Sequence, residues 1–314
     1  MAEITAKLVA ELREKTSAGM MDCKNALTEC GGDLESAADW LRQKGIVKAA
    51  KKADRVAASG LVAASVSADK KLGIVVEVNA ETDFVAKNDK FQKLVGDVAA
   101  TALKIFGGCG CAKKSTAECA GECFTKIVDA MSDEVKGLIA TIGENMNIRR
   151  ARAVTGDAVY TYVHNALTNG MGQIGVVVAL NGPSPQSGAE ITTQLNEIGQ
   201  KIAMHIAANK PEFLNIAEVD PASVEREKKI FIDSGKTAGK PEMVVEKMIN
   251  GRIAAYYGES VLEEQPFVMD PSKTVKQVVS ESGGTIAGFA YFLLGEGIEK
   301  HEDDLACEVA KMLK

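Results

Sequence analysis

Four cysteines lie close together in the stretch GGCGCAKKSTAECAGEC, where they could act as metal ligands. They are Cys109, Cys111, Cys119 and Cys123. Four thiolates can hold a zinc ion, but C-x-C followed by C-x3-C is not one of the common zinc-ligand spacings. We interpret the group as reduced thiols on a loop and keep a zinc site as the alternative. We therefore predict no bound metal and no cofactor.

Two glycine-containing stretches resemble phosphate-binding loops. GMGQIG, at 170–175, matches G-x-G-x-x-G, which binds dinucleotides only between a strand and a helix. A strand-like run, VVVAL, follows it here, so we assign these glycines to a hairpin turn. SGKT, at 234–237, ends like a P-loop, but Ile230 stands where the leading glycine is required. We predict that the chain does not bind nucleotides directly.

The stretch ETDFVAKN, at 81–88, is a different kind of candidate site. It follows a strand-like run, GIVVEVN, and precedes a helix-like run, FQKLVGDVAATAL. It places Asp83 and Phe84 where the backbone leaves a sheet, yet it holds no obvious catalytic group. The chain has three histidines and no arrangement typical of Ser/His/Asp, Cys/His or paired-carboxylate chemistry. This favours protein binding over catalysis, and we predict no catalytic residues.

Composition narrows the class of protein. The chain has 314 residues with 46% hydrophobic content, enough for two or three domains. Its 43 acidic and 37 basic residues give a net charge of −6, which argues against DNA binding. The start MAEITAKLVA is not a signal peptide, and no apolar run could span a membrane. With seven cysteines and no secretion signal, we expect reduced thiols in a cytoplasmic protein.

The elements at the N-terminal end are helical. Residues 3–44 predict three short helices with apolar stripes, and Asp33 is a good N-cap for the third. Trp40 is expected to fill the small core between them. Residues 44–59 are basic and rich in alanine, which predicts a partly helical connector. A positive strip that meets an acidic partner or RNA is the alternative.

The middle of the chain repeats one plan. A hairpin pattern at 61–79 is followed by an amphipathic helix from Phe91. A second hairpin pattern, at 158–181, contains Asn169-Gly170, whose two residues are expected to have positive φ, and another helix follows. We infer two related α+β units, each an antiparallel sheet covered by helices.

The last third alternates between charged helices and short elements. Two charged segments between 221 and 260 flank SGKTAGKP and predict a helical hairpin that stands off the body. Asp270-Pro271 is expected to begin a short helix, with Pro at its first position. A strand at 285–294 and a last helix at 302–314 are expected to close the chain.

Six stretches together identify a family resemblance. They are TSAGMMDCKNAL, NAETDFVAKN, IGENMNIRR, HIAANKPEF, QPFVMDPSKTV and GEGIEK. The chain resembles the elongation factor Ts family over nearly its whole length, and TDFVAKN and IGENMNIRR are specific to that family. Three features depart from the family pattern. Ala80 replaces a frequent Cys, Gln173 takes the place of an Arg in a longer hairpin after His164, and the stretch 107–123 has no counterpart.

The resemblance implies an α+β fold with five parts. A three-helix domain resembling ubiquitin-associated modules, with the basic linker, occupies 1–55. Two related core subdomains follow at 56–156 and 157–220. A protruding antiparallel helical hairpin is inserted at 221–262, and a C-terminal module with a returning strand and last helix occupies 263–314.

The resemblance also implies a function in protein synthesis. Family members bind elongation factor Tu and release its GDP by disturbing the magnesium and phosphate site. By position, Thr82, Asp83, Phe84 and Val85 form the disrupting loop. Met20, Lys24, Ile142, Gly143 and His164 are further expected contacts. The resemblance leaves the oligomeric state open between a homodimer and a heterotetramer with elongation factor Tu. The alternatives are a cysteine-rich metal-binding protein and a tethering protein that exchanges no nucleotide.

Overall fold

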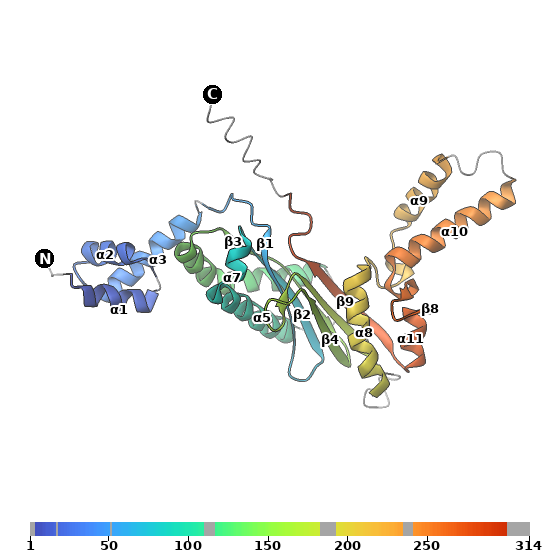
Figure 1. Ribbon diagram of the computed structural model, residues 1–314, viewed down its shortest axis with the longest axis horizontal. Coiled ribbons are helices and arrows are strands. Elements are labelled where there is room, and N and C mark those ends of the chain that lie inside the picture. Colours follow the sequence, from blue (N-terminus) through green and yellow to red (C-terminus); the bar gives the residue numbers. More distant parts are fainter. Residues whose placement is uncertain are drawn as a thin grey trace, which may run out of the picture.

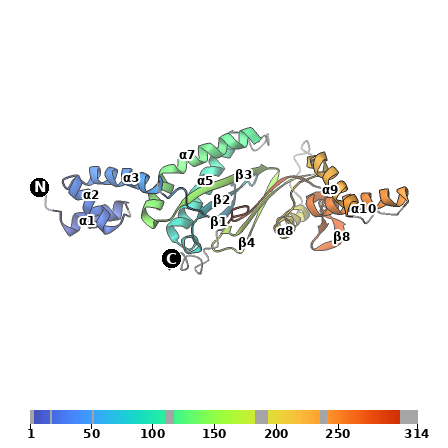
Figure 2. The same cartoon turned by 90° about the horizontal axis from the view of Figure 1, so that it is seen from above.

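The computed structural model describes residues 4–16, 18–50, 52–109, 117–182, 193–234 and 241–299. The fold is α+β and elongated, with helices at the N-terminal end, antiparallel sheets in the middle and two helices at the opposite end (Figure 1). The sheets and the helices that cover them lie between these two ends, as the view from above also shows (Figure 2). No helix in these ranges is long and apolar enough to cross a membrane.

Three helices form a small core at the N-terminal end. They are α1 (Ala6–Thr16), α2 (Met20–Glu29) and α3 (Leu34–Ala50). Leu12 and Leu27 are fully buried between them, and Trp40 packs partly buried against the same cluster. The Asp33 side chain accepts a hydrogen bond of 2.8 Å from the Ser36 N–H and so caps α3 as expected.

Helix α3 is longer than the sequence indicated. It continues through the first part of the basic connector to Ala50 and lies against α7 (Ala117–Ile142). Arg42 pairs with Asp133 of α7 at 2.7 Å, and Ala49 is buried in the core of the first sheet. Ala49, one of the alanines that suggested a connector, therefore serves as a small side chain that lets α3 approach α7.

The first sheet has the strand order β3-β2-β1-β5, and its neighbouring strands pair antiparallel. Its strands are β1 (Ser59–Val66), β2 (Leu72–Ala80), β3 (Met146–Thr155) and β5 (Met171–Gly172). Helices α5 (Asp89–Cys109) and α7 cover one face through Phe91, Val95 and Ile127. Strand β2 is buried at every residue because the second sheet covers its other face.

The second sheet has the order β4-β6-β9 and is also antiparallel. Its strands are β4 (Ala158–His164), β6 (Ile174–Asn181) and β9 (Thr285–Leu293), and α8 (Thr193–Asn209) covers its outer face. The two sheets approach closely at glycines. A Cβ on Gly73 would lie 2.4 Å from Val159, and one on Gly175 would lie 2.5 Å from Val62. The prediction of two sheets with covering helices is confirmed.

The segment that contains Asn169-Gly170 differs from a simple hairpin turn. Residues 165–173 leave the second sheet and place β5 beside β1 of the first. Gly170 has φ 75°, but Asn169 is not among the positive-φ residues, so the expectation for Asn169 is wrong. One left-handed residue suffices because Met171 N–H already bonds Thr168 across the turn at 3.1 Å. A strand does follow here, as predicted, but β6 begins at Ile174, so Gly175 lies inside it and Gly172 lies in β5.

Two helices project from the second sheet. Asp220 caps α9 (Pro221–Asp233), and α10 (Glu242–Ser260) returns, with Arg252 and Glu227 paired at 3.2 Å (Figure 1). The short elements η1 (Ile216–Glu218) and η2 (Leu262–Glu264) precede α9 and follow α10 in the chain. A third short element, α4 (Asp83–Ala86), follows β2 of the first sheet. Gly235, Lys236 and Thr237 of the SGKT motif lie outside the described residues.

The expected helix start at Asp270-Pro271 is wrong. Residues Asp270–Thr274 form β8, which pairs with β7 (Pro266–Phe267), and α11 spans Val275–Glu281. Thr274 and Gln277 form a reciprocal capping box, which fixes the start of α11 four residues later than Pro271 alone suggested. The expected last helix at 302–314 lies outside the described residues.

We expect the projecting helices to be dispensable for folding. Helix α9 buries no residue, and Ser260 is the only buried residue of α10. Replacing 223–256 by a short Gly/Ser link should keep the circular dichroism of the sheets and change Tm by less than about 3 °C, because exposed residues contribute little to stability. Loss of the cooperative thermal transition would contradict this expectation.

Candidate interaction site

The Asp83-Phe84 loop forms a one-turn helix, α4, directly after β2. The Phe84 side chain is 76% exposed, whereas Val85 is 4% exposed and packs with Ala86 in the core of the first sheet. Two neighbours therefore hold the turn down while Phe84 points into solvent. In the free protein Phe84 is thus no core plug, and Val85 anchors the turn in the core.

Charged groups surround the exposed ring. Lys87 Nζ lies 3.3 Å from the Asp83 carboxylate and 5.8 Å from the centre of the Phe84 ring. Both charged side chains are well exposed, so their pairing contributes little to stability. Asp83, Phe84 and Lys87 thus form a small exposed patch that a partner can reorganise at low cost.

The loop before α4 and the loop after α7 form reciprocal hydrogen bonds through a carboxylate from each. The Glu144 carboxylate accepts a hydrogen bond of 3.0 Å from Thr82 N–H and another of 2.8 Å from the Thr82 hydroxyl. In return, the Glu81 carboxylate accepts from Asn145 N–H. We call these four residues the carboxylate clasp. Hydrogen bonds to charged groups are roughly twice as strong as neutral ones, so the clasp fixes the start of α4.

The connector after α3 binds the clasp residues through hydrogen bonds and an ion pair. Asn145 is buried and donates to the carbonyls of Ala53 and Arg55 at 3.2 and 2.7 Å. The Arg55 guanidinium lies 3.6 Å from Glu81, and Lys52 donates to the Gly143 carbonyl. The second part of the basic connector is therefore part of the site and not only a linker.

The structure brings some of the predicted site residues together. Ile142 ends α7, and Gly143 follows with φ 90°, so both adjoin the clasp. Met20 and Lys24 lie on α2, at the far N-terminal end of the molecule (Figure 1). Sequence reasoning missed Glu144 and Asn145 as supports of the loop. Their signal was the IGENMNIRR stretch, in which only the first two positions were singled out.

His164 lies at a second exposed surface. It is exposed at the end of β4, where its Nδ1 is 3.0 Å from the Tyr162 hydroxyl. A groove of about 340 Å³ beside it is also lined by Val268 and Met269, which are 50% and 51% exposed. Sequence reasoning missed this apolar pair, whose signal was two hydrophobic residues inside the turn of QPFVMDP.

A buried histidine holds that exposed turn. Val268 N–H donates to His205 Nδ1 at 3.2 Å, so Nε2 must carry the proton that it donates to the Gln265 side-chain oxygen at 2.9 Å. Burial lowers the pKa of His205, although the Gln265 bond works in the opposite direction. His205 is therefore a neutral structural residue rather than an acid–base group.

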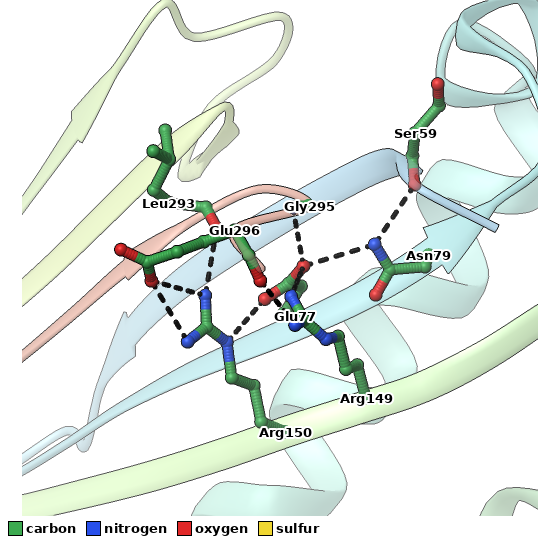
Figure 3. Close-up of polar contacts among 8 residues, drawn as sticks. All are labelled: Ser59, Glu77, Asn79, Arg149, Arg150, Leu293, Gly295 and Glu296. Atoms are coloured by element: carbon green, nitrogen blue, oxygen red, sulfur yellow. Dashed lines mark hydrogen bonds and ion pairs between the residues drawn. The ribbon is translucent and has the colours of Figure 1, made fainter. Parts of the chain in front are cut away.

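A buried carboxylate joins β2 to the end of β9 (Figure 3). Glu77 is fully buried and accepts hydrogen bonds from Arg149 at 3.1 Å, Gly295 N–H at 2.8 Å and Asn79 at 3.1 Å, besides its ion pair with Arg150. Arg150 also bonds the Leu293 carbonyl at 2.9 Å and pairs with Glu296 at 3.2 Å. We call this the Glu77 network.

The Glu77 network keeps its central carboxylate ionised. Burial alone would raise the pKa of Glu77, but the Gly295 N–H, Arg150 and Asn79 together hold that pKa below its usual value. An ionised, fully bonded group in this place fixes β3 and the turn at Gly295 relative to β2. The same strand, β2, leads four residues later into the clasp.

Comparisons of the sequence with known proteins match the chain to a family. The family model described as "Elongation factor TS" matches residues 81–296. An elongation factor Ts from Hyphomonas neptunium is 50% identical over 315 residues, covering 100% of this chain and 99% of that protein. Those from Rhodospirillum centenum and Parvibaculum lavamentivorans are 49% and 48% identical, with at least 98% of each protein covered.

The chain belongs to the elongation factor Ts family. The family resemblance seen in the sequence is confirmed. As an elongation factor Ts, the protein is a nucleotide exchange factor that binds elongation factor Tu in translation elongation, and it is not an enzyme. The family match begins at Glu81 of the clasp and ends at Glu296 of the Glu77 network.

The metal-binding alternative involves cysteines that lie partly outside the described residues. In the described ranges no three His, Cys, Asp or Glu residues are grouped so that they could hold a metal ion. Cys111 lies outside the described residues, and nothing is described of the Cys119 side chain. Cys109 and Cys123 are described, and their sulfur atoms are 2.8 Å apart.

We expect Glu77→Gln to lose stability in a pH-dependent way. At pH 7 the variant should be less stable by about 3 kcal/mol, because Arg149 and Arg150 lose their buried partner charge. The folded-state pKa of Glu77 is depressed, so its contribution is present above the unfolded-state value of about 4.3 and is lost as pH falls through the folded value.

Urea unfolding at pH 7, 5 and 3.5 measures this effect. The difference between wild type and Glu77→Gln should shrink at the lowest pH. Glu225→Gln, at an exposed position on α9, is the control and should show no such difference. A constant difference at all three pH values would show that the ionised state of Glu77 does not matter.

Proposed function

We propose that the protein releases GDP from elongation factor Tu by inserting Phe84 close to the magnesium and phosphate site of its partner. Asp83 steers the partner loop beside it, Thr82 ties the turn to the carboxylate clasp, and Val85 anchors the turn from below. The observation that carries this proposal is a 76% exposed phenylalanine on a helical turn that the carboxylate clasp holds in place. The proposed place of action is the cytoplasm.

An exposed aromatic ring on a rigid base is suited to binding. A Phe side chain offers roughly 150–250 Å² of surface, and burial is worth about 25 cal/mol per Å². Residual freedom of the loop would consume part of that gain in lost conformational entropy on binding. The two bonds from Thr82 to Glu144 remove this freedom before the partner arrives.

The proposed mechanism is a linkage between two ligands of elongation factor Tu. GDP is held by backbone groups of a phosphate loop and by Mg²⁺, which neutralises phosphate charge. An exchange factor that stabilises a state with spoiled Mg²⁺ contacts weakens GDP binding. By thermodynamic reciprocity, nucleotide binding then lowers the affinity of elongation factor Tu for the exchange factor by the same ratio. This scheme requires neither a catalytic group nor a nucleotide site on the factor.

Other surfaces supply affinity in this proposal. Met20 is 61% exposed on α2 and, with Lys24, lines a groove against α1. Ile142 and Gly143 adjoin the clasp, and His164 lies beside Val268 and Met269. These residues lie on separate elements of a long body, so they would contact different parts of a large partner.

The finer domain division follows the family. We assign 1–55 to a ubiquitin-associated-like domain with its linker, and 56–156 and 157–220 to the two core subdomains. The antiparallel helical hairpin occupies 221–262, and the C-terminal module occupies 263–314. The buried Ala49 and the bonds from Asn145 to Ala53 and Arg55 support a first domain that is docked rather than freely tethered.

Phe84→Ala should slow exchange more than it weakens binding. At saturating factor, we expect GDP release from elongation factor Tu to fall by about tenfold or more, since about 1.4 kcal/mol corresponds to tenfold in rate. Stopped-flow release of a fluorescent GDP measures the saturated rate. Ile230→Ala removes another exposed apolar side chain, on α9, and should leave that rate unchanged. Equal saturated rates for Phe84→Ala and wild type would disprove the wedge role.

Substitutions on α2 should have the opposite kinetic signature. Met20→Ala combined with Lys24→Ala should raise the factor concentration needed for half-maximal exchange about tenfold, because they remove contact surface far from the loop. The saturated rate should stay within about twofold of wild type, because the wedge is intact. The same stopped-flow titration gives both quantities. A reduced saturated rate with unchanged affinity would assign α2 to the exchange step instead.

A further inference from the structure

Two cysteines from different helices meet at one end of the helical layer. Cys109 is the last residue of α5, and Cys123 lies in the first two turns of α7. Their sulfur atoms are 2.8 Å apart. Cys123 is 1% exposed and belongs to the core under the first sheet, whereas Cys109 is exposed to solvent. The exchange function leaves this pair without a role.

The separation of the two sulfur atoms is close to bonding distance. A disulfide has an S–S length of about 2.05 Å, so the 2.8 Å contact must shorten by less than about 1 Å. Packing already fixes Cys123 among core residues such as Ile127 and Phe106. Rotation of the exposed Cys109 side chain at the helix end can supply the remaining movement.

We propose that Cys109 and Cys123 form a redox modification site that a hydroperoxide converts into an intramolecular disulfide. In the first step the Cys109 thiolate sulfur attacks one peroxide oxygen, the O–O bond breaks, and the leaving hydroxide takes up a proton. Cys109 is then a sulfenic acid. In the second step the Cys123 sulfur attacks the Cys109 sulfur, the S–O bond breaks, and hydroxide leaves with the Cys123 proton. Two thiols and hydrogen peroxide thus give one disulfide and two waters.

Exposure and burial determine which sulfur is oxidised first and which one then forms the disulfide. Oxidants reach exposed thiols first, which makes Cys109 the attacking residue. Burial raises the pKa of Cys123 to about 11, and the neighbouring Cys109 adds to this effect, so Cys123 stays protonated. It is a poor target for peroxide but lies in contact with the sulfur atom that becomes oxidised. Cys123 is therefore the resolving cysteine.

The site lies away from the exchange loop along the helical layer. Helix α5 begins at Asp89, just after α4, and ends at Cys109, while α7 ends at Ile142 beside the clasp. The disulfide would therefore join the ends of α5 and α7 that are remote from Phe84. We expect it to stabilise the helical layer and to leave nucleotide exchange unchanged.

Peroxide treatment of the reduced full-length protein tests the proposal. Hydrogen peroxide near stoichiometry, followed by alkylation and peptide mapping, should give a Cys109–Cys123 linked peptide that a thiol reductant removes. A short cross-linked loop restricts the unfolded chain, so Tm should rise by about 5 °C on oxidation. Cys109→Ser, at an exposed helix end that should still fold, should show neither the linked peptide nor the Tm rise. Cys30→Ser, in the N-terminal helices, should behave like wild type.

Several results would overturn the proposal. Linkage of Cys109 or Cys123 to Cys111 or Cys119 would identify a different pair. Peroxide that drives Cys109 to a sulfinic acid without a linked peptide would show that Cys123 does not resolve it. Stoichiometric zinc in the purified protein would make the thiols metal ligands. A fall in the saturated exchange rate on oxidation, restored by reductant and absent in Cys109→Ser, would contradict the separation of this site from the exchange loop.

Discussion

The buried charge of Glu77 sets the constraint on which the rest of the core depends. An unpaired carboxylate inside a sheet would cost several kcal/mol, so its partners must be in place whenever the chain is folded. Arg149 comes from β3 and Gly295 from the turn after β9, so one side chain joins three segments that are distant in sequence (Figure 3). Apolar packing between the two sheets would tolerate small slips, but a carboxylate with these hydrogen-bond partners does not.

This fixed strand explains how the protein keeps an aromatic side chain in water. Strand β2 carries Glu77, and the next residue after the strand, Glu81, belongs to the clasp. The position of the sheet therefore fixes where α4 begins. Thr82 is then bound through its backbone and its hydroxyl by Glu144. The exposed Phe84 thus stands on a support whose polar groups are already satisfied. A partner meets a preorganised surface and does not have to order a loop.

The sequence predicted the elements well where local pattern and tertiary packing agreed. Alternating hydrophobic residues and helical stripes placed both sheets and their covering helices. Prediction failed where two local signals competed, as at Pro271, where the Thr274 capping box set the helix start. How far α3 continues into the partly helical connector was also not predictable, because it depends on Ala49 packing into a core distant in sequence. The same holds at the site. Asp83 and Phe84 were visible as an unusual loop, but their supports, Glu144 and Asn145, come from a segment about sixty residues later.

The elongated shape allows affinity and exchange to be separate properties of one chain. Affinity can draw on contacts spread over α2, the clasp region and the turn at Val268, which lie on separate elements. Exchange instead needs differential binding, because only contacts that favour the nucleotide-poor state of elongation factor Tu weaken GDP binding. A short, rigid loop is suited to that task, since a flexible one would adapt to both states of the partner equally. The Glu77 network and the clasp are therefore not only stabilising features. In the proposed mechanism they supply the stiffness that lets binding over a long surface disturb the partner locally, at the site that Phe84 reaches.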